Sequence, residues 1–214
     1  ENIRCLVITG SGKAFSAGQD LKEAIDPMGP EIEEIVANHY NPIIRAIREI
    51  EKPIVAAVNG VAAGAGANIA LACDLVVAKA SASFIQAFSK IGLIPDSGGT
   101  FMLPRIVGMQ RATALMFLGD KVGAIEAEEM GMIYKCVEDE DFEGFVEKLS
   151  LKLAAMPTRG LGLTKHALNQ SMNHDLDQQL NLEKILQKEA SETHDYNEGV
   201  QAFLDKRKPN FKGN

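Results

Sequence analysis

The chain of 214 residues has only three cysteines, Cys5, Cys73 and Cys136, and no two of them form a C-x-x-C motif. An odd number of scattered cysteines is typical of neither a disulfide framework nor a zinc site. We expect these cysteines to be small, buried side chains in a reducing compartment, which predicts a cytoplasmic protein.

Positive charge and long apolar runs are also scarce. Lys and Arg number 22 against 29 Asp and Glu, so the formal net charge is −7. A protein that binds duplex nucleic acid needs a basic surface, so we expect no nucleic-acid partner. No apolar run approaches the ~20 residues of a transmembrane helix, so we expect no membrane partner either.

Common metal, phosphate and dinucleotide motifs are incomplete. The histidines are His39, His166, His174 and His194. They have no metal-ligand spacing, and we expect no metal site. The segment 10–13 follows a strand pattern, as a phosphate-binding loop does. It lacks one glycine and the hydroxyl residue that the phosphate-loop motif requires. The segment 64–66 resembles a dinucleotide motif, but Ile69 stands at the third glycine position.

Apolar residues make up 46% of the chain, and their periodicity predicts alternating strands and helices. The predicted elements are a strand at Ile3–Thr9, a helix at Ile32–Ile50, a strand at Ile54–Val58, a helix at Ala62–Ala72 and a strand at Asp74–Ala78. Pro42 is expected to bend or interrupt the first helix. From Phe142 onward only helical patterns remain. We therefore predict an α/β core over 1–140 and a helical region over 141–214. Because Glu1 lies so close to a core strand, we also expect an N-terminal part to precede it.

Two glycine- and alanine-rich segments, Ala14–Leu21 and Asn59–Asn68, each combine a strand end, a turn and a helix start. Each could present free backbone N–H groups, and two such donors converging on one oxygen make an oxyanion hole. The alternative is that the small residues only let helices pack tightly on a sheet. Asp96 leaves a similar choice, because an aspartate before 97–100 is either a helix N-cap or a catalytic carboxylate.

The ordered motifs A-F-S-A-G-x-D-L, P-x-x-A-x-V-N-G-x-A-x-G-x-G, C-D and G-L-I-P-D-x-G-G-T resemble the crotonase (enoyl-CoA hydratase/isomerase) superfamily. The resemblance extends from about Ile3 to Phe211. The segments 83–86 and 94–100 most resemble isomerases of bacterial phenylacetate degradation, which act on ring-epoxidised phenylacetyl-CoA and 3-enoyl-CoA thioesters. The resemblance implies an α/β spiral of ββα units. It also implies a C-terminal helical region that forms a homotrimer, often a dimer of trimers.

The resemblance also implies roles for individual residues. The oxyanion-hole N–H groups fall at Ala17 and Ala65, and Asp96 falls at a catalytic position of several isomerases and a dehalogenase. The other expected substrate-binding residues are Ser16, Gly18, Gln19, Asp20, Gly64, Asn68 and Phe88. Two glutamates that activate water in the hydratases are replaced by Asn68 and Phe88. Neither residue can act as a base, and Phe88 would keep the pocket dry.

The resemblance therefore predicts an acyl-CoA isomerase without a cofactor. It would convert a ring-epoxidised phenylacetyl-CoA to an oxepin-CoA, or a 3-enoyl-CoA to a 2-enoyl-CoA, with Asp96 as the proton shuttle. The alternatives are an enoyl-CoA hydratase that uses Asp96 and an unusual water, and a non-catalytic trimeric scaffold. A more distant alternative is a serine hydrolase that uses Ser97.

Overall fold

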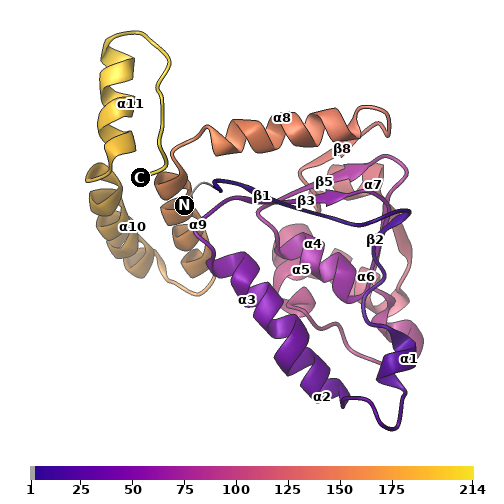
Figure 1. The fold of residues 1–214 in the computed structure, drawn as a ribbon. Helices are drawn as coiled ribbons and strands as arrows, with labels where there is room; N and C mark the ends of the chain where they lie inside the picture. Colours follow the sequence, from indigo (N-terminus) through magenta and orange to yellow (C-terminus); the bar gives the residue numbers. More distant parts are fainter. Residues whose placement is uncertain (1–2) are drawn as a thin grey trace. The chain divides into compact units, whose positions relative to one another are not determined.

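Two four-stranded sheets carry the fold in the computed structural model, which describes residues 3–214 (Figure 1). The strands are β1 (Leu6–Thr9), β2 (Ala14–Ser16), β3 (Ile54–Val58), β4 (Val61–Ala63), β5 (Leu75–Lys79), β6 (Ser83–Ile85), β7 (Lys121–Gly123) and β8 (Lys135–Val137). One sheet has the order β1-β3-β5-β8 and the other β2-β4-β6-β7. Successive strands from β1 to β6 therefore alternate between the sheets, which confirms the predicted spiral of ββα units.

Helices and helical turns connect the strands and complete the chain. They are α1 (Leu21–Ala24), α2 (Ile32–Ile35), the π-helical turn η1 (Val36–Tyr40), α3 (Asn41–Glu49), α4 (Ala65–Ala72), the 3₁₀ turn η2 (Ala87–Ile91), α5 (Gly99–Val107), α6 (Met109–Leu118), α7 (Ala124–Glu129), α8 (Phe142–Ala154), α9 (Thr158–Ser171), α10 (Leu176–Ser191) and α11 (His194–Leu204). None of the helices in the described range is both long and apolar enough to cross a membrane.

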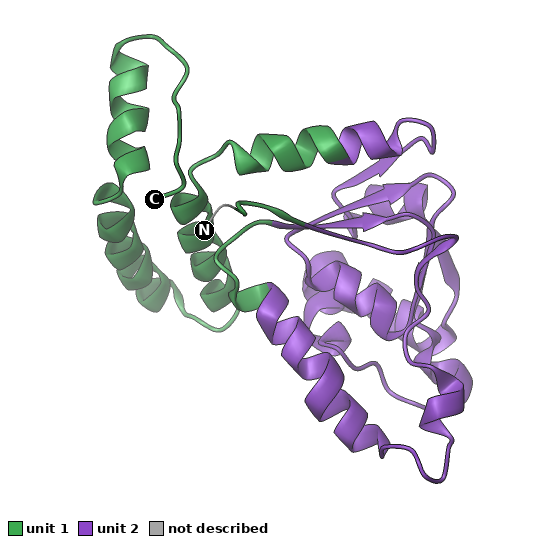
Figure 2. Ribbon diagram, viewed as in Figure 1, with its two compact units in different colours: residues 1–6, 48–53, 147–214 green, residues 7–47, 54–146 purple. Residues whose placement is uncertain are grey.

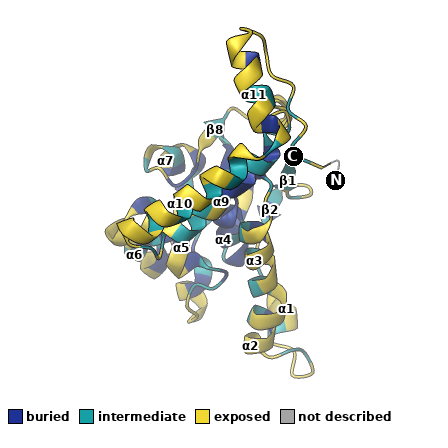
Figure 3. Cartoon of the chain, turned by 90° about the vertical axis from the view of Figure 1, so that its left-hand side faces the viewer, coloured by how far each residue is buried: buried dark blue, intermediate teal, exposed yellow. Residues whose placement is uncertain are grey.

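The chain divides into two compact units (Figure 2). The core unit holds residues 7–47 and 54–146, and the C-terminal unit is built mainly from residues 147–214. In the core unit every residue of β3 is buried, as expected for a parallel strand covered on both faces. Helix α4 is also largely buried (Figure 3). Its Gly66 is required by packing, because an added Cβ would lie 2.5 Å from the carbonyl oxygen of Ser16.

Two predictions about local structure need correction. The helix predicted to begin at Ala62 begins at Ala65, because Val61–Ala63 forms the short strand β4, which pairs in parallel with β2 and β6. Three residues are too few to show the period-two alternation of a strand. The first strand spans Leu6–Thr9 rather than Ile3–Thr9.

Pro42 changes the hydrogen-bond pattern of the helix around it without ending the helix. The five residues before Asn41 form η1, and the Asn41 N–H donates to the carbonyl of Val36, five residues earlier. A proline ring collides with the carbonyl four residues before it in a regular α-helix, so a wider turn is the expected response. This turn carries Tyr40.

Candidate active site

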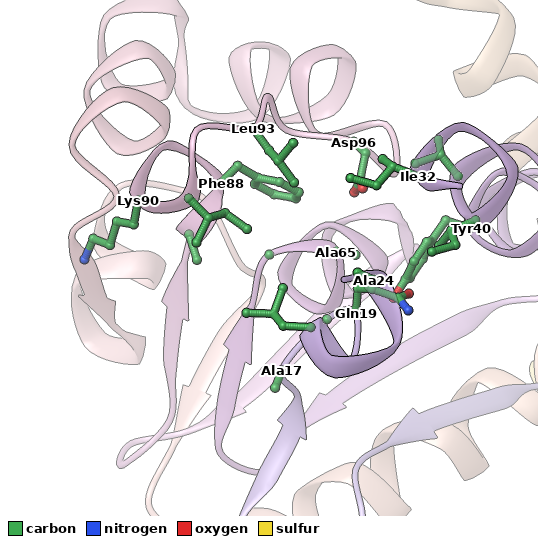
Figure 4. A pocket seen from close by; sticks show the side chains of 17 residues that line it. Ala17, Gln19, Ala24, Ile32, Tyr40, Ala65, Phe88, Lys90, Leu93 and Asp96 are labelled. Atoms are coloured by element: carbon green, nitrogen blue, oxygen red, sulfur yellow. The ribbon is translucent and has the colours of Figure 1, made fainter. Parts of the chain in front are cut away.

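A cavity of about 220 Å³ opens in the core unit (Figure 4). Its lining residues are Ala17, Gly18, Gln19, Leu21, Ala24, Ile32, Ile35, Val36, Tyr40, Gly64, Ala65, Ala87, Phe88, Lys90, Ile91, Leu93 and Asp96. Most of these are apolar or small, and only a few carry a polar group. An apolar cavity with a few convergent polar groups is the usual form of a small-molecule site.

Asp96 is the only carboxylate among the described residues that line the cavity. It lies just before α5, and its backbone carbonyl accepts a hydrogen bond of 2.9 Å from the side-chain amide of Asn68. Asn68 in turn accepts a 2.8 Å bond from the amide of Gln86. Because Asn68 and Gln86 are both buried, this chain of hydrogen bonds fixes the backbone that carries the carboxylate.

The Asp96 carboxylate does not cap α5. The N-cap residue is Gly98, and it makes no side-chain capping bond. Oδ1 of Asp96 instead accepts a 2.9 Å hydrogen bond from the hydroxyl of Ser97. Ser97 is buried and has a φ of 50°, a left-handed conformation that is rare for residues other than glycine. Such strain is found preferentially at functional sites.

Burial raises the pKa of Asp96 above its usual value of 3.8, and the hydrogen bond from Ser97 offsets part of this rise. The physical cause is that the partly dehydrated carboxylate is a less stable anion. A raised pKa makes a carboxylate a stronger base once it has lost its proton, which suits proton abstraction from carbon.

Ala17 and Ala65 line the cavity across from Asp96 (Figure 4). Ala65 is the first residue of α4, so its N–H has no acceptor within the helix. Ala17 precedes Gly18, where an added Cβ would lie 3.3 Å from the Ala65 nitrogen and where φ is +85°. Glycine therefore lets the segment that carries Ala17 approach the start of α4.

The structure brings together seven of the ten predicted site residues. Ala17, Gly18, Gln19, Gly64, Ala65, Phe88 and Asp96 all line the cavity, whereas Ser16, Asp20 and Asn68 are not among its lining residues. The Ser16 hydroxyl accepts a bond from the Gly18 N–H. Asp20 caps α1 by accepting from the Lys22 N–H. Asn68 holds the Asp96 loop, as described above.

Several wall residues were not singled out from the sequence. Leu21, Ile32, Ile91 and Leu93 line the cavity although at least two-fifths of each is exposed. Exposed apolar side chains gathered around one opening indicate a place where an apolar group binds. The helical periodicity identified the apolar face that includes Ile32, but periodicity does not say what that face covers.

The cysteine and histidine patterns predicted no metal site. No group of three or more His, Cys, Asp or Glu residues suited to holding a metal ion occurs within residues 3–214.

The sequence matches the family model for enoyl-CoA hydratase/isomerase over residues 1–214. The chain belongs to this family. It is 49% identical to a 1,2-epoxyphenylacetyl-CoA isomerase of Escherichia coli, covering 100% of this chain and 82% of the relative. It is 37% identical to a trans-2-decenoyl-[acyl-carrier-protein] isomerase of Streptococcus mutans, with the same coverage of 100% and 82%. Family membership makes the chain an enzyme of the crotonase superfamily, as the ordered motifs predicted.

A solved structure of an enoyl-CoA hydratase from Polaromonas superposes on this chain with a TM-score of 0.90 at 34% identity. The superposition covers 98% of this chain and 82% of the other. Enzymes named as hydratases and as isomerases therefore share this fold. The fold is compatible with both reactions, and the side chains in the cavity determine which of them the enzyme catalyses.

Proposed function

We propose that this family member is an acyl-CoA isomerase in which Asp96 moves a proton between two carbons of the acyl group. The observation that carries the proposal is the pairing of one carboxylate with two backbone N–H donors across an apolar cavity. The likeness to an epoxyphenylacetyl-CoA isomerase supports it. The substrate class is either a ring-epoxidised phenylacetyl-CoA or a 3-enoyl-CoA.

The reaction follows from where charge develops. The N–H groups of Ala17 and Ala65 would bind the thioester oxygen and stabilise the enolate that forms when Asp96 removes a proton from the α-carbon. Protonated Asp96 then returns the proton farther along the conjugated system. A 3-enoyl thioester thereby becomes a 2-enoyl thioester with no atom gained or lost. Phe88, which points into the cavity, would keep water away from the enolate (Figure 4).

The chief alternative is hydration of an enoyl-CoA. The resemblance places two glutamates in the hydratases where this chain has Asn68 and Phe88, and no other carboxylate among the described residues lines the cavity. A serine hydrolase is also disfavoured, because Ser97 is buried and is not among the residues that line the cavity.

The test compares wild type with Asp96→Asn and Asp96→Ala. Asparagine nearly preserves the shape but cannot accept a proton, so turnover of a 3-enoyl-CoA should fall about 10²–10⁴-fold. Asp139→Asn is the matched control, because Asp139 is exposed and bonds Ser81 outside the cavity. Turnover of Asp96→Asn within a few-fold of wild type would refute the mechanism. If wild type removes the absorbance of the conjugated thioester in crotonyl-CoA, the hydratase alternative is favoured. If wild type turns over no thioester at all, the scaffold alternative is favoured.

We also propose that the chain assembles as a homotrimer or a dimer of trimers. Helix α11 leaves Tyr196, Val200, Phe203 and Leu204 at least two-fifths exposed, at the i, i+4, i+7, i+8 spacing of one helix face. Phe203→Lys should lower the sedimentation mass at micromolar concentration, whereas Gln201→Lys, a charge added at another exposed position, should not. A wild-type mass equal to one chain would contradict the proposal.

The cytoplasmic location and the independence from cofactors remain predictions.

A further inference from the structure

Tyr40 is a second polar side chain of the cavity that the proposed reaction does not use. The polar side chains among the lining residues are Gln19, Tyr40, Lys90 and Asp96. The ammonium group of Lys90 points away from the cavity (Figure 4). Tyr40 and Asp96 reach the cavity from different elements, η1 and the segment before α5. The cavity therefore combines a proton acceptor with a separate hydroxyl donor.

The surroundings of Tyr40 favour a hydrogen bond to a ligand. Its side chain is half-buried, and its neighbours in the wall include Ile32, Ile35 and Val36. Burial and the charges of Asp96 and Glu23 act on its hydroxyl, and no hydrogen bond from another described residue contributes to the pKa of Tyr40. A phenol is stable in an apolar wall when its O–H finds an acceptor, since leaving such a group unpaired costs free energy.

Tyr40 keeps its proton at neutral pH. Burial raises its pKa above the usual 10.0, and the negative charges of Asp96 and then Glu23 raise it further. The phenol is thus a neutral donor in the cavity where the acyl group would bind, so an oxygen atom of that group can accept its hydrogen bond. The thioester oxygen is already assigned to Ala17 and Ala65 under the proposed function. The remaining acceptor is an oxygen elsewhere on the acyl group.

We propose that the Tyr40 hydroxyl determines specificity by donating a hydrogen bond to an oxygen atom of the acyl group. The site then prefers acyl-CoA thioesters that carry an epoxide or cyclic-ether oxygen over hydrocarbon enoyl-CoA thioesters. This inference rests on the proposed function and names the residue that chooses between its two substrate classes. A site built to hydrogen-bond a substrate oxygen discriminates strongly against an analogue that lacks it.

The test measures one ratio, kcat/KM for ring-epoxidised phenylacetyl-CoA divided by kcat/KM for 3-hexenoyl-CoA. Tyr40→Phe removes only the hydroxyl, and the ratio should fall about tenfold or more, which corresponds to one hydrogen bond of about 1.4 kcal/mol. Most of the loss should lie in KM, because the bond forms in the ground state as well as the transition state. Tyr134→Phe, at an exposed tyrosine outside the cavity, is the matched control.

An unchanged or higher ratio in Tyr40→Phe would overturn the inference, even if both activities fell together. A second measurement uses only wild type and compares inhibition by phenylacetyl-CoA and by 2-hydroxyphenylacetyl-CoA. Tighter binding of the oxygen-bearing ester supports the inference, and equal or weaker binding contradicts it. The proposed function is tested separately, because it stands or falls with the loss of 3-hexenoyl-CoA turnover in Asp96→Asn.

Discussion

The core unit and the C-terminal unit use small and large residues in opposite ways. In the core unit, Gly66 and Gly18 let backbone segments approach so closely that an added Cβ would lie 2.5 Å or 3.1 Å from a backbone oxygen. In the C-terminal unit, α11 leaves Phe203 83% exposed. Figure 3 shows the same contrast between the buried α4 and the largely exposed α10. One unit fixes the positions of N–H donors, and the other presents an apolar surface.

The polar groups differ in the same way. The amides of Asn68 and Gln86 are buried and bonded in series to the backbone of Asp96. In the C-terminal unit, Glu198 and Arg207 form an ion pair whose two Nη···Oε distances are 2.7 and 2.9 Å, close to solvent. Buried hydrogen bonds are costly to break on one side, whereas exposed ion pairs contribute little. A substitution that breaks a buried hydrogen bond of the core unit should therefore cost more stability than one that breaks an exposed bond of the C-terminal unit.

The largest difference in stability is expected between two Gly→Ala variants. Gly66→Ala places a methyl group 2.5 Å from the Ser16 carbonyl oxygen, and such overpacking should cost about 1–3 kcal/mol of unfolding free energy. Gly160→Ala, in α9, meets no atom closer than 3.9 Å and should stabilise by about 0.5–1 kcal/mol. Urea unfolding measures both. Gly66→Ala should also lose activity, because it moves β2 away from α4; a stable and active variant would contradict the packing argument.

Breaking the amide chain should have the next largest effect. Asn68→Ala leaves the amide of Gln86 and the carbonyl of Asp96 without this partner, at a cost of about 1–3 kcal/mol. Asn197→Ala removes an exposed bond to the Thr193 carbonyl in the C-terminal unit and should change stability by less than about 0.5 kcal/mol. The melting temperatures of both variants test this, and equal shifts would show that burial does not matter here.

The sequence predicted the framework of the site better than its details. The ordered motifs singled out Ala17, Ala65 and Asp96, which line one cavity, because each lies in a distinctive glycine-rich or strand-end segment. The short strand β4 and the bonding role of Asn68 were not predictable. Three residues carry no readable period, and an amide does not reveal its partner 28 positions away. Tyr40 shows the same limit, because its place in the cavity depends on the π-helical turn before Pro42.

The smallest effect should be the pH dependence of two carboxylates, which has opposite signs in the two units. Arg207, followed by the Asn210 N–H, lowers the pKa of Glu198 from 4.5 to about 2. Glu198 therefore contributes stability above pH 4.5, and this contribution is lost as the pH falls through about 2. The pKa of Asp96 is raised above 3.8. Its contribution to folding stability is therefore greatest below pH 3.8 and is lost as the pH rises through the raised pKa.

Melting temperatures of wild type, Glu198→Gln and Asp96→Asn between pH 2 and 7 separate these signs. Glu198→Gln should have a lower melting temperature than wild type at pH 5–7. This difference should close toward pH 2 and shrink in high salt, because a partly exposed ion pair is screened. The melting temperature of Asp96→Asn should rise relative to that of wild type as the pH rises, since asparagine has no charge to bury. The same rise in pH should switch on turnover in wild type, because only the deprotonated carboxylate accepts the α-proton. If instead Asp96→Asn loses stability relative to wild type above pH 5, the Asp96 carboxylate is stabilised by a partner and is not a dehydrated base.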